Sequence, residues 1–193
     1  MQMNEIIASD YKRRLDLLDV TLKEKETKIQ DIEKNLVDLS KRSKEKNLVS
    51  IEPLFEGDLV SVYKKGNVIR FFSQKTEELL VEKDFLKEQL LSLSKDDYII
   101  TGVLTKEEET PCFYVTDCFY SKQNLEELAF EDRKKVLDCF NYSDSIRQNG
   151  CLFVENQDDA NRAISLLSKN SGVCGIMLKD YSRPSKTTII YTK

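Results

Sequence analysis

The chain has 193 residues, of which 40% are hydrophobic and 33% are charged, and its formal net charge is -4. This length and apolar content are enough to bury one core, so we expect one globular domain with an appendage. The near balance of charge gives the whole protein no field that would hold nucleic acid tightly. Histidine is absent and the five cysteines form no C-x-x-C pair, which argues against a zinc site and leads us to expect no metal.

The chain also has no sequence feature of secretion or membrane insertion. It contains no apolar run near 18 residues, starts with a polar segment, and has an odd number of cysteines. We therefore expect an intracellular, reduced protein that is cytoplasmic or associated with nucleic acid, with no membrane contact.

Residues 1–47 are predicted to form a long helix with a heptad seam. The seam alternates steps of four and three, and its positions are Tyr11, Leu15, Leu18, Leu22, Lys25, Ile29, Ile32, Leu36 and Leu39. In a parallel pair Arg14 would face Asp19 of the partner and Lys28 would face Glu33, which favours a coiled-coil homodimer. A single helix packed along its own domain is the alternative, and a hetero-assembly through the same seam is also open.

Residues 48–193 are predicted to form the globular domain. Adjacent pairs of strand-like segments favour an α+β fold with mixed, mainly antiparallel sheets and flanking helices. The expected strands are 58–63, 67–72, 98–104, 112–120, 151–154, 173–178 and 187–192, and the expected helices are 77–93, 125–140 and 158–167. The first two strands form a hairpin, and Asn156 or Asp158 is the N-cap of the last helix.

A succession of segments in this domain resembles one known family. Residues 54–59 stand in the place of K-x-D-G-x-R, residues 60–74 in that of a hairpin ending in Ser-Arg, and residues 100–104 in that of D-G-E. Residues 113–120 resemble F-D-x-L-Y, residues 125–134 the polar helix that follows it, and residues 175–180 and 191–193 the segments E-G-x-M-x-K-D and K-x-K. The order is similar to that of the adenylation (nucleotidyltransferase) domain of the superfamily of ATP-dependent DNA ligases, RNA ligases and capping enzymes.

The same resemblance implies a degenerate pocket. In that family the lysine of the first segment attacks the α-phosphate of ATP and carries AMP, and here that position is Leu54. The family's other pocket residues are replaced by Leu59 at the arginine, Val103 at the acid of D-G-E, Thr116 at the adenine-stacking aromatic residue and Cys174 at the late acid. Glu56 keeps only a carboxylate. The residues that match are Gly57, Gly102, Asp117, Gly175, Lys179 and Lys193.

The matching residues leave two interpretations open. Glycines permit close strand contacts and Asp117 can satisfy backbone amides, so a structural role explains most of the matches. Lys179 and Lys193 can alternatively still bind a phosphate. Cys174 has no histidine to activate it, which favours a structural thiol, and Lys64 and Lys65 are expected to be solvated in the hairpin turn.

We therefore expect a pseudoenzyme without catalytic residues, cofactor or OB-fold. The leading hypothesis is a ligase-like module that acts in protein assembly or as a structural subunit of a larger complex, with an unidentified partner protein. A non-catalytic nucleic-acid-binding protein, aided by the basic cluster at residues 41–46, is the first alternative. A nucleotidyltransferase completed by a partner is the second.

Overall fold

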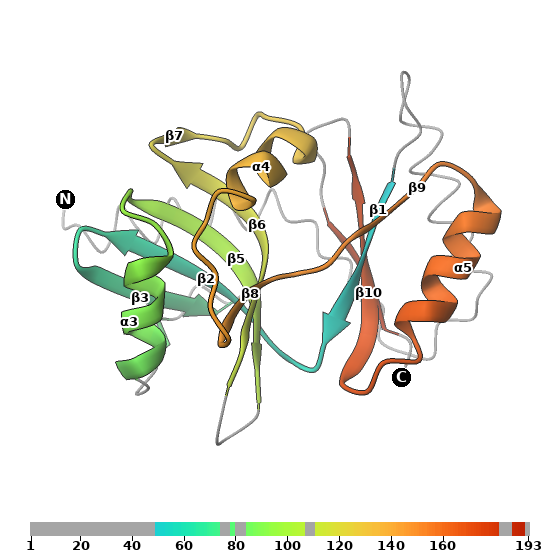
Figure 1. Ribbon diagram of the computed structural model, residues 1–193, viewed down its shortest axis with the longest axis horizontal. Coiled ribbons are helices and arrows are strands. Elements are labelled where there is room, and N and C mark those ends of the chain that lie inside the picture. Colours follow the sequence, from blue (N-terminus) through green and yellow to red (C-terminus); the bar gives the residue numbers. More distant parts are fainter. Residues whose placement is uncertain (1–48, 74–77, 80–83, 107–110, 182–186, 192–193) are drawn as a thin grey trace.

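The computed structural model describes residues 49–73, 78–79, 84–106, 111–181 and 187–191. The expected coiled-coil segment at residues 1–47 and Lys193 lie outside the described residues. The described chain folds into two sheets that stand side by side, each with helices packed on it (Figure 1). None of the helices described has the length and apolar character required to span a membrane.

The smaller sheet has four antiparallel strands in the order β11-β10-β1-β9. These strands are β1 (Val49–Phe55), β9 (Leu152–Val154), β10 (Val173–Asp180) and β11 (Thr188–Tyr191). Helix α5 (Gln157–Leu167) contacts β1, β9 and β10, and a core that includes Val49, Ile51, Ile176 and Leu178 lies beneath it. The side chain of Asn156 caps α5 by accepting a hydrogen bond from the amide of Asp159 at 2.9 Å.

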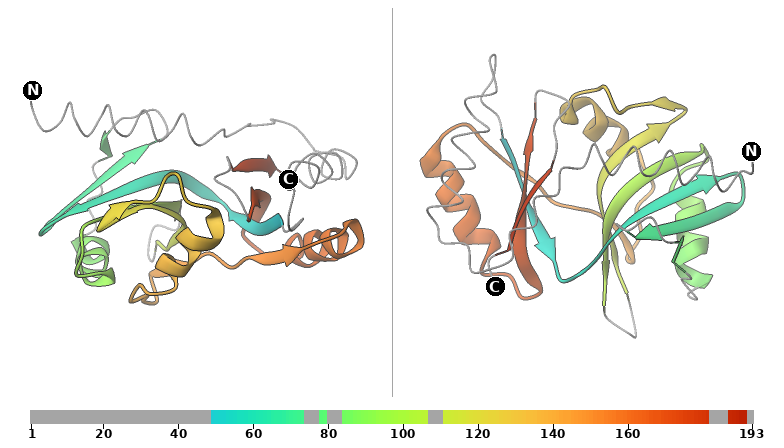
Figure 2. Two further views of the ribbon diagram at one scale, coloured as in Figure 1. Left: turned by 90° about the horizontal axis from the view of Figure 1, so that it is seen from above. Right: turned by 180° about the vertical axis from the view of Figure 1, so that it is seen from behind.

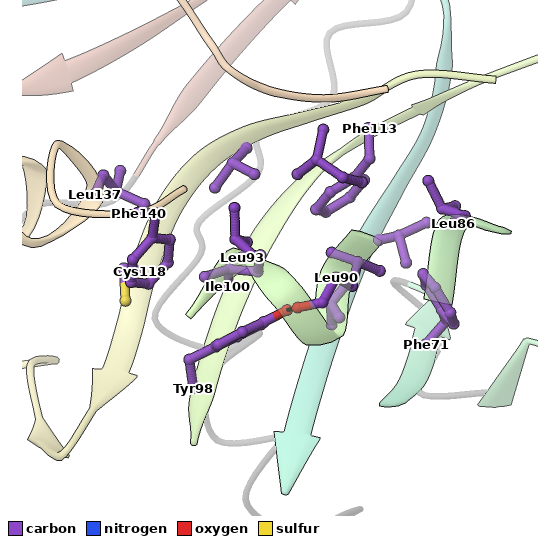
Figure 3. Packing of buried hydrophobic residues seen from close by; sticks show 14 of the residues in the cluster. Phe71, Leu86, Leu90, Leu93, Tyr98, Ile100, Phe113, Cys118, Leu137 and Phe140 are labelled. Carbon is purple, nitrogen blue, oxygen red and sulfur yellow. Dashed lines mark hydrogen bonds between the residues drawn. The ribbon is translucent and has the colours of Figure 1, made fainter. Parts of the chain in front are cut away.

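The larger sheet has seven strands, with β4-β3-β2-β5-β6-β7 in order and β8 parallel to β6. Their bounds are Gly57–Lys65 for β2, Val68–Ser73 for β3, Glu78–Leu79 for β4, Tyr98–Thr105 for β5, Phe113–Ser121 for β6, Gln123–Asn124 for β7 and Ile146–Gln148 for β8. Helices α3 (Asp84–Leu93) and α4 (Phe130–Leu137) supply side chains to the core on one face of this sheet. In that core Phe71, Leu86 and Leu90 lie together, and the hydroxyl of Tyr98 donates to the carbonyl of Leu90 at 2.7 Å (Figure 3).

The α+β class and the mainly antiparallel sheets are confirmed, as is the hairpin of β2 and β3. Three expectations about elements need correction. Residues 78–79 pair with β3, so the first helix begins at Asp84 and not at residue 77. The second helix is limited to Phe130–Leu137. Strands β1, β4, β7 and β8 are additions to the expected set. Of the two candidate N-caps of α5, the structure selects Asn156.

Strand β1 contains a proline, Pro53, which interrupts its apolar pattern. The pairing of β1 with its neighbours explains why a proline is tolerated there. The strand pairs with β10 over its whole length but with β9 only at residues 49–51. Pro53 therefore lies beyond the stretch that has a strand on both sides, where the missing amide breaks no ladder hydrogen bond. The chain then passes directly from β1 to β2, so the junction between the sheets is one continuous segment.

Candidate functional site

Within the described residues, those expected to form a degenerate pocket lie at the junction of the two sheets. They divide into two adjoining groups, an apolar cluster and a buried network of charges. The two groups are built from β1 and β10 of the smaller sheet, from β2, β5 and β6 of the larger sheet, and from α4 and β11.

The apolar cluster contains four of the predicted pocket positions, namely Leu54, Leu59, Val103 and Cys174. Its buried members are Leu54, Val103, Met177 and Ile189, against which Phe55, Leu59 and Cys174 pack. The strand register explains this grouping, because Leu54 is opposite Gly175 and Leu59 is opposite Val103. Leu54 is only 3% exposed, so an aliphatic side chain fills the position that the resemblance assigns to a nucleophile.

Two glycines near this cluster are required by close backbone contacts. A Cβ on Gly57 would overlap the carbonyl oxygen of Leu104, and a Cβ on Gly102 would overlap that of Tyr114. These contacts favour the structural interpretation of the matching glycines. Glu56, the remaining carboxylate of the first segment, has an exposed side chain, and only its amide is fixed, by donation to the carbonyl of Gly172 at 2.9 Å.

The charged network begins at Lys179, which does not face solvent. Its Nζ lies 2.9 Å from Oε1 of Glu52, donates to the carbonyl of Thr116, and sits 4.2 Å from the ring centroid of Phe130. The side chains of Lys179 and Glu52 are 2% and 1% exposed. This lysine is therefore held by three partners, a carboxylate, a carbonyl and an aromatic face.

The second ion pair of the network joins Asp117 on β6 to Arg133 on α4. The guanidinium donates through Nε to Oδ1 at 2.8 Å and through Nη2 to Oδ2 at 3.0 Å, while Nη1 donates to the carbonyl of Leu128 at 2.6 Å. Asp117 also accepts a hydrogen bond from the amide of Cys118 at 2.8 Å. The expectation that Asp117 satisfies a backbone amide is thus met, and the bidentate arginine is an addition to it.

The two carboxylates of the network have pKa values shifted in opposite directions. Burial raises the pKa of Glu52, and this effect exceeds the opposing attraction of Lys179 and the hydrogen bond from Asn149. Burial would also raise the pKa of Asp117, but the combined attraction of Arg133 and Lys179 outweighs it and holds that pKa below its ordinary value. The network carries two acids and two bases, so its charges can balance internally.

Asn149 connects this network to the backbone of β1. Its Nδ2 donates to Oε2 of Glu52 at 3.1 Å and to the carbonyl of Pro53 at 3.0 Å, and its own amide donates to the carbonyl of Val115 at 2.8 Å. The asparagine therefore binds β1 of one sheet to β6 of the other.

The charged network also contains three residues that were not expected in the site from the sequence, namely Glu52, Arg133 and Asn149. Glu52 precedes Leu54 by two positions and shares its face of β1, a relation that is hidden in the sequence because β1 is not among the expected strands. Lys64 also needs correction. It lies in β2 and not in the turn, is 7% exposed, and donates to the carbonyls of Lys95 at 3.3 Å and Asp96 at 3.1 Å.

The charged side chains of the described residues offer no cluster of three or more cysteines or carboxylates able to hold a metal ion. The thiol of Cys174 donates to the carbonyl of Leu54 at 3.5 Å, and Thr116 hydrogen-bonds to the carbonyl of Thr101 at 3.2 Å. The geometry is that of a joint between two sheets, closed by apolar packing on one side and by paired charges on the other.

Comparisons with known proteins bear on the fold. No family model and no curated protein sequence matches the chain. Solved structures do match. The ligase domain of M. tuberculosis LigD is 14% identical with a TM-score of 0.60, covering 75% of this chain and 53% of that one. A putative ATP-dependent DNA ligase from Aquifex aeolicus is 16% identical with a TM-score of 0.59, covering 83% and 46%.

An RNA ligase from Naegleria gruberi is also similar, at 15% identity and a TM-score of 0.53, covering 91% of this chain and 56% of that chain. The chain spans about half the length of the solved structures to which it is similar. The described chain thus has the nucleotidyltransferase fold found in ATP-dependent DNA ligases and RNA ligases.

Proposed function

We propose that the chain is a non-catalytic module with the ligase fold that acts in protein assembly, as a structural subunit of a larger complex. One observation carries the proposal. Leu54 is buried in an apolar cluster with Val103, Met177 and Ile189, at the position that the sequence resemblance assigns to the nucleophilic lysine.

Two lysines that could replace the missing nucleophile support the same conclusion. A lysine must lose its proton to act as a nucleophile, and a carboxylate partner favours the protonated form. Lys179 is paired with Glu52, and Lys64 is held by two carbonyl groups. Both amines are therefore engaged by acceptor groups, and Leu54 has no group that can form a phosphoramidate.

A protein partner is supported by the distribution of exposed apolar side chains. Three of the five large ones within the described ranges, Leu152, Phe153 and Leu166, lie on β9 and α5. Strand β9 is the edge of the smaller sheet, and Leu166 is 62% exposed. Contiguous exposed apolar patches are typical of protein-binding surfaces, and these three residues are the candidates for such a patch on the smaller sheet.

The catalytic part of the proposal is tested with α-labelled ATP and magnesium. After incubation and denaturing electrophoresis, we expect no acid-labile label on the chain. A covalent label would refute the non-catalytic assignment, and mapping it to a lysine would identify the nucleophile. Addition of cell extract to the same reaction tests whether a partner completes an active enzyme.

The assembly part is tested by affinity purification of the full chain with three variants. We expect the wild type to bring down a partner in fixed stoichiometry, and Leu152→Asp and Leu166→Asp to lose it. Val68→Asp is the matched control, since Val68 is 55% exposed but lies on the larger sheet. Equal recovery with all three variants would exclude the β9–α5 surface.

Nucleic-acid binding is the competing outcome. A gel shift of nicked, duplex or single-stranded DNA that weakens steeply with salt would favour it over assembly. The pairing of Arg133 and Lys179 with carboxylates leaves these two buried cations no free charge for phosphates, so we expect no shift from this site.

A further inference from the structure

The chain passes between the two sheets twice within the described residues. It leaves the smaller sheet at Glu56, between β1 and β2, and returns at residues 149–151, between β8 and β9. The returning segment belongs to the orange stretch that runs from β8 across to β9 (Figure 1 and Figure 2). The hydrogen bond from Asn149 to the carbonyl of Pro53 ties the two crossings to each other. Asn149 therefore closes the joint at the place where the chain itself connects the sheets.

The residue after Asn149 is Gly150, and an Asn–Gly pair is chemically labile. The backbone nitrogen of the glycine attacks Cγ of the asparagine, and the lack of a Cβ on glycine leaves this approach open. A new C–N bond closes a succinimide ring, while the bond from Cγ to Nδ2 breaks and releases ammonia. Water then opens the ring at either carbonyl carbon to give aspartate or isoaspartate. In sum, an amide and one water molecule become a carboxylate and an ammonium ion.

The closed joint opposes this reaction. Asn149 is 5% exposed, and the Nδ2 group that would leave is held by Glu52 at 3.1 Å and by Pro53 at 3.0 Å. Its backbone amide is fixed on the carbonyl of Val115. No described residue donates to Oδ1, so none would stabilise the negative charge that this oxygen carries in the tetrahedral intermediate. Gly150, by contrast, is exposed, and little packing restrains the chain on that side.

We propose that Asn149 is a deamidation site guarded by the joint, where the reaction occurs when the two sheets separate and then prevents them from closing again. A carboxylate at position 149 has no hydrogen to donate to Glu52 or to the carbonyl of Pro53. The buried network would also hold three acids and two bases in place of two of each. The modification thus makes a transient opening permanent.

Three variants separate the steps of this scheme. Gly150→Ala hinders the attacking nitrogen and leaves the joint intact, because a Cβ there would meet no atom within 4 Å. Lys179→Met weakens the joint from the other side of Glu52 and leaves the labile pair itself unchanged. Asn149→Asp introduces the product directly.

The first measurement follows conversion at position 149 in the full chain by peptide mapping and mass spectrometry, at mildly alkaline pH. The rate in the folded protein is the rate of the open form multiplied by its population. We expect the folded wild type to react at least about tenfold more slowly than the same protein unfolded in urea. Lys179→Met should raise the rate of the folded protein by about tenfold or more, and Gly150→Ala should react slowly in both states.

Equal rates in the folded and the unfolded wild type would overturn the protection. A rate that Lys179→Met leaves unchanged would overturn the role of the joint. If that variant does not fold, wild-type protein in urea below the unfolding midpoint provides the same test without a substitution. Its rate should rise with the population of the open form, and a constant rate would refute the proposal.

The second measurement asks whether the product keeps the joint open. Asn149→Asp should unfold at a lower urea concentration than wild type, and also lower than Asn149→Ala, which loses the hydrogen bonds without adding a charge. Aged wild-type protein should acquire a fraction with the same lowered midpoint, whereas aged Gly150→Ala should not. A midpoint of Asn149→Asp equal to that of wild type would overturn the claim that the reaction prevents closure.

None of these measurements involves ATP or a partner protein. Failure of the deamidation scheme is therefore distinct from failure of the proposed function.

Discussion

The Glu52–Lys179 pair permits a sharp test of the idea that the junction is a structural joint. Lys179→Met removes the cation and leaves Glu52 buried beside the negative charge of Asp117. Both members of the pair are 2% exposed or less, so water cannot replace the lost partner. Breaking a buried pair from one side costs about 3 to 5 kcal/mol.

The double variant Glu52→Gln with Lys179→Met should behave differently. It removes both charges and keeps most of the volume, and such replacements are often neutral or stabilising. We expect its free energy of unfolding to lie within about 1.5 kcal/mol of wild type. Glu52→Gln alone should also destabilise the protein, because it leaves the buried cation without its carboxylate, so the summed losses of the two single variants should exceed the loss of the double variant by at least about 1.5 kcal/mol.

The assay is urea unfolding of the full chain, with the midpoint compared at constant m-value. Lys134→Met is the matched control, because Lys134 pairs with Asp138 at 2.8 Å on the surface, where the carboxylate is 53% exposed. That variant should lose roughly 0 to 1 kcal/mol. If Lys179→Met cost no more than Lys134→Met, the buried pair would not hold the joint and the structural interpretation of Lys179 would fail.

Three further predictions concern the same junction. Leu54→Ala should lower the free energy of unfolding by about 2 to 5 kcal/mol in urea, because it opens a cavity in a cluster with Met177, and a loss below about 1 kcal/mol would contradict the packing. Asp117 has a lowered pKa, so its stabilisation is present above its ordinary pKa of 3.8 and is lost as the pH falls further. Asp117→Asn should therefore lower the melting temperature at neutral pH, and the melting temperature of this variant should fall less steeply below about pH 4. If the variant lost melting temperature below pH 4 as steeply as the wild type, groups other than Asp117 would be responsible for that loss. Gly102→Ala should lower the free energy of unfolding, measured in urea, by about 1 to 3 kcal/mol, because the added Cβ would meet a backbone carbonyl. Gly150→Ala is the control and should change this free energy little, because its Cβ would meet nothing within 4 Å. Equal effects of the two substitutions would refute the close contact at Gly102.

Much of the fold is accessible from the sequence because its strands follow simple periodicity. The hairpin of β2 and β3 is marked by β-branched and aromatic residues on both sides of Gly66, whose φ of +56° suits a tight turn. Strand β1 is not accessible in this way. Glu52 and Pro53 interrupt its apolar pattern, and its stability comes from pairing with β10, about 120 residues away in sequence.

The apolar cluster of the site can be predicted from the sequence better than the charged network can. The resemblance finds Leu54, Leu59, Val103 and Cys174, which meet in one cluster because their strands occupy fixed places in the sheets. It cannot find Arg133 as the partner of Asp117. A helix packed on a sheet can present an arginine at many positions, and only the tertiary fold selects one.

In the charged network, the identity of a lysine does not reveal whether its amine is buried or which group it contacts. Lys179 matches the family pattern, which leaves phosphate binding open, but the sequence alone gives no sign that Glu52 lies 2.9 Å from its amine. Lys64 is expected in solvent for a similar reason. Its burial depends on the carbonyls of Lys95 and Asp96, which come from the loop before β5.

The course of the hydrogen bonds of Asn149 has a consequence for how the molecule unfolds. Asn149 ties β1 to the strand that carries Asp117, through its side chain on one side and its backbone amide on the other. Separation of the two sheets would therefore leave a buried acid and a buried base without their partners at the same time. Loss of one sheet should then entail loss of the other. Hydrogen exchange in β1 and β6 should accordingly report one shared opening event with a common free energy.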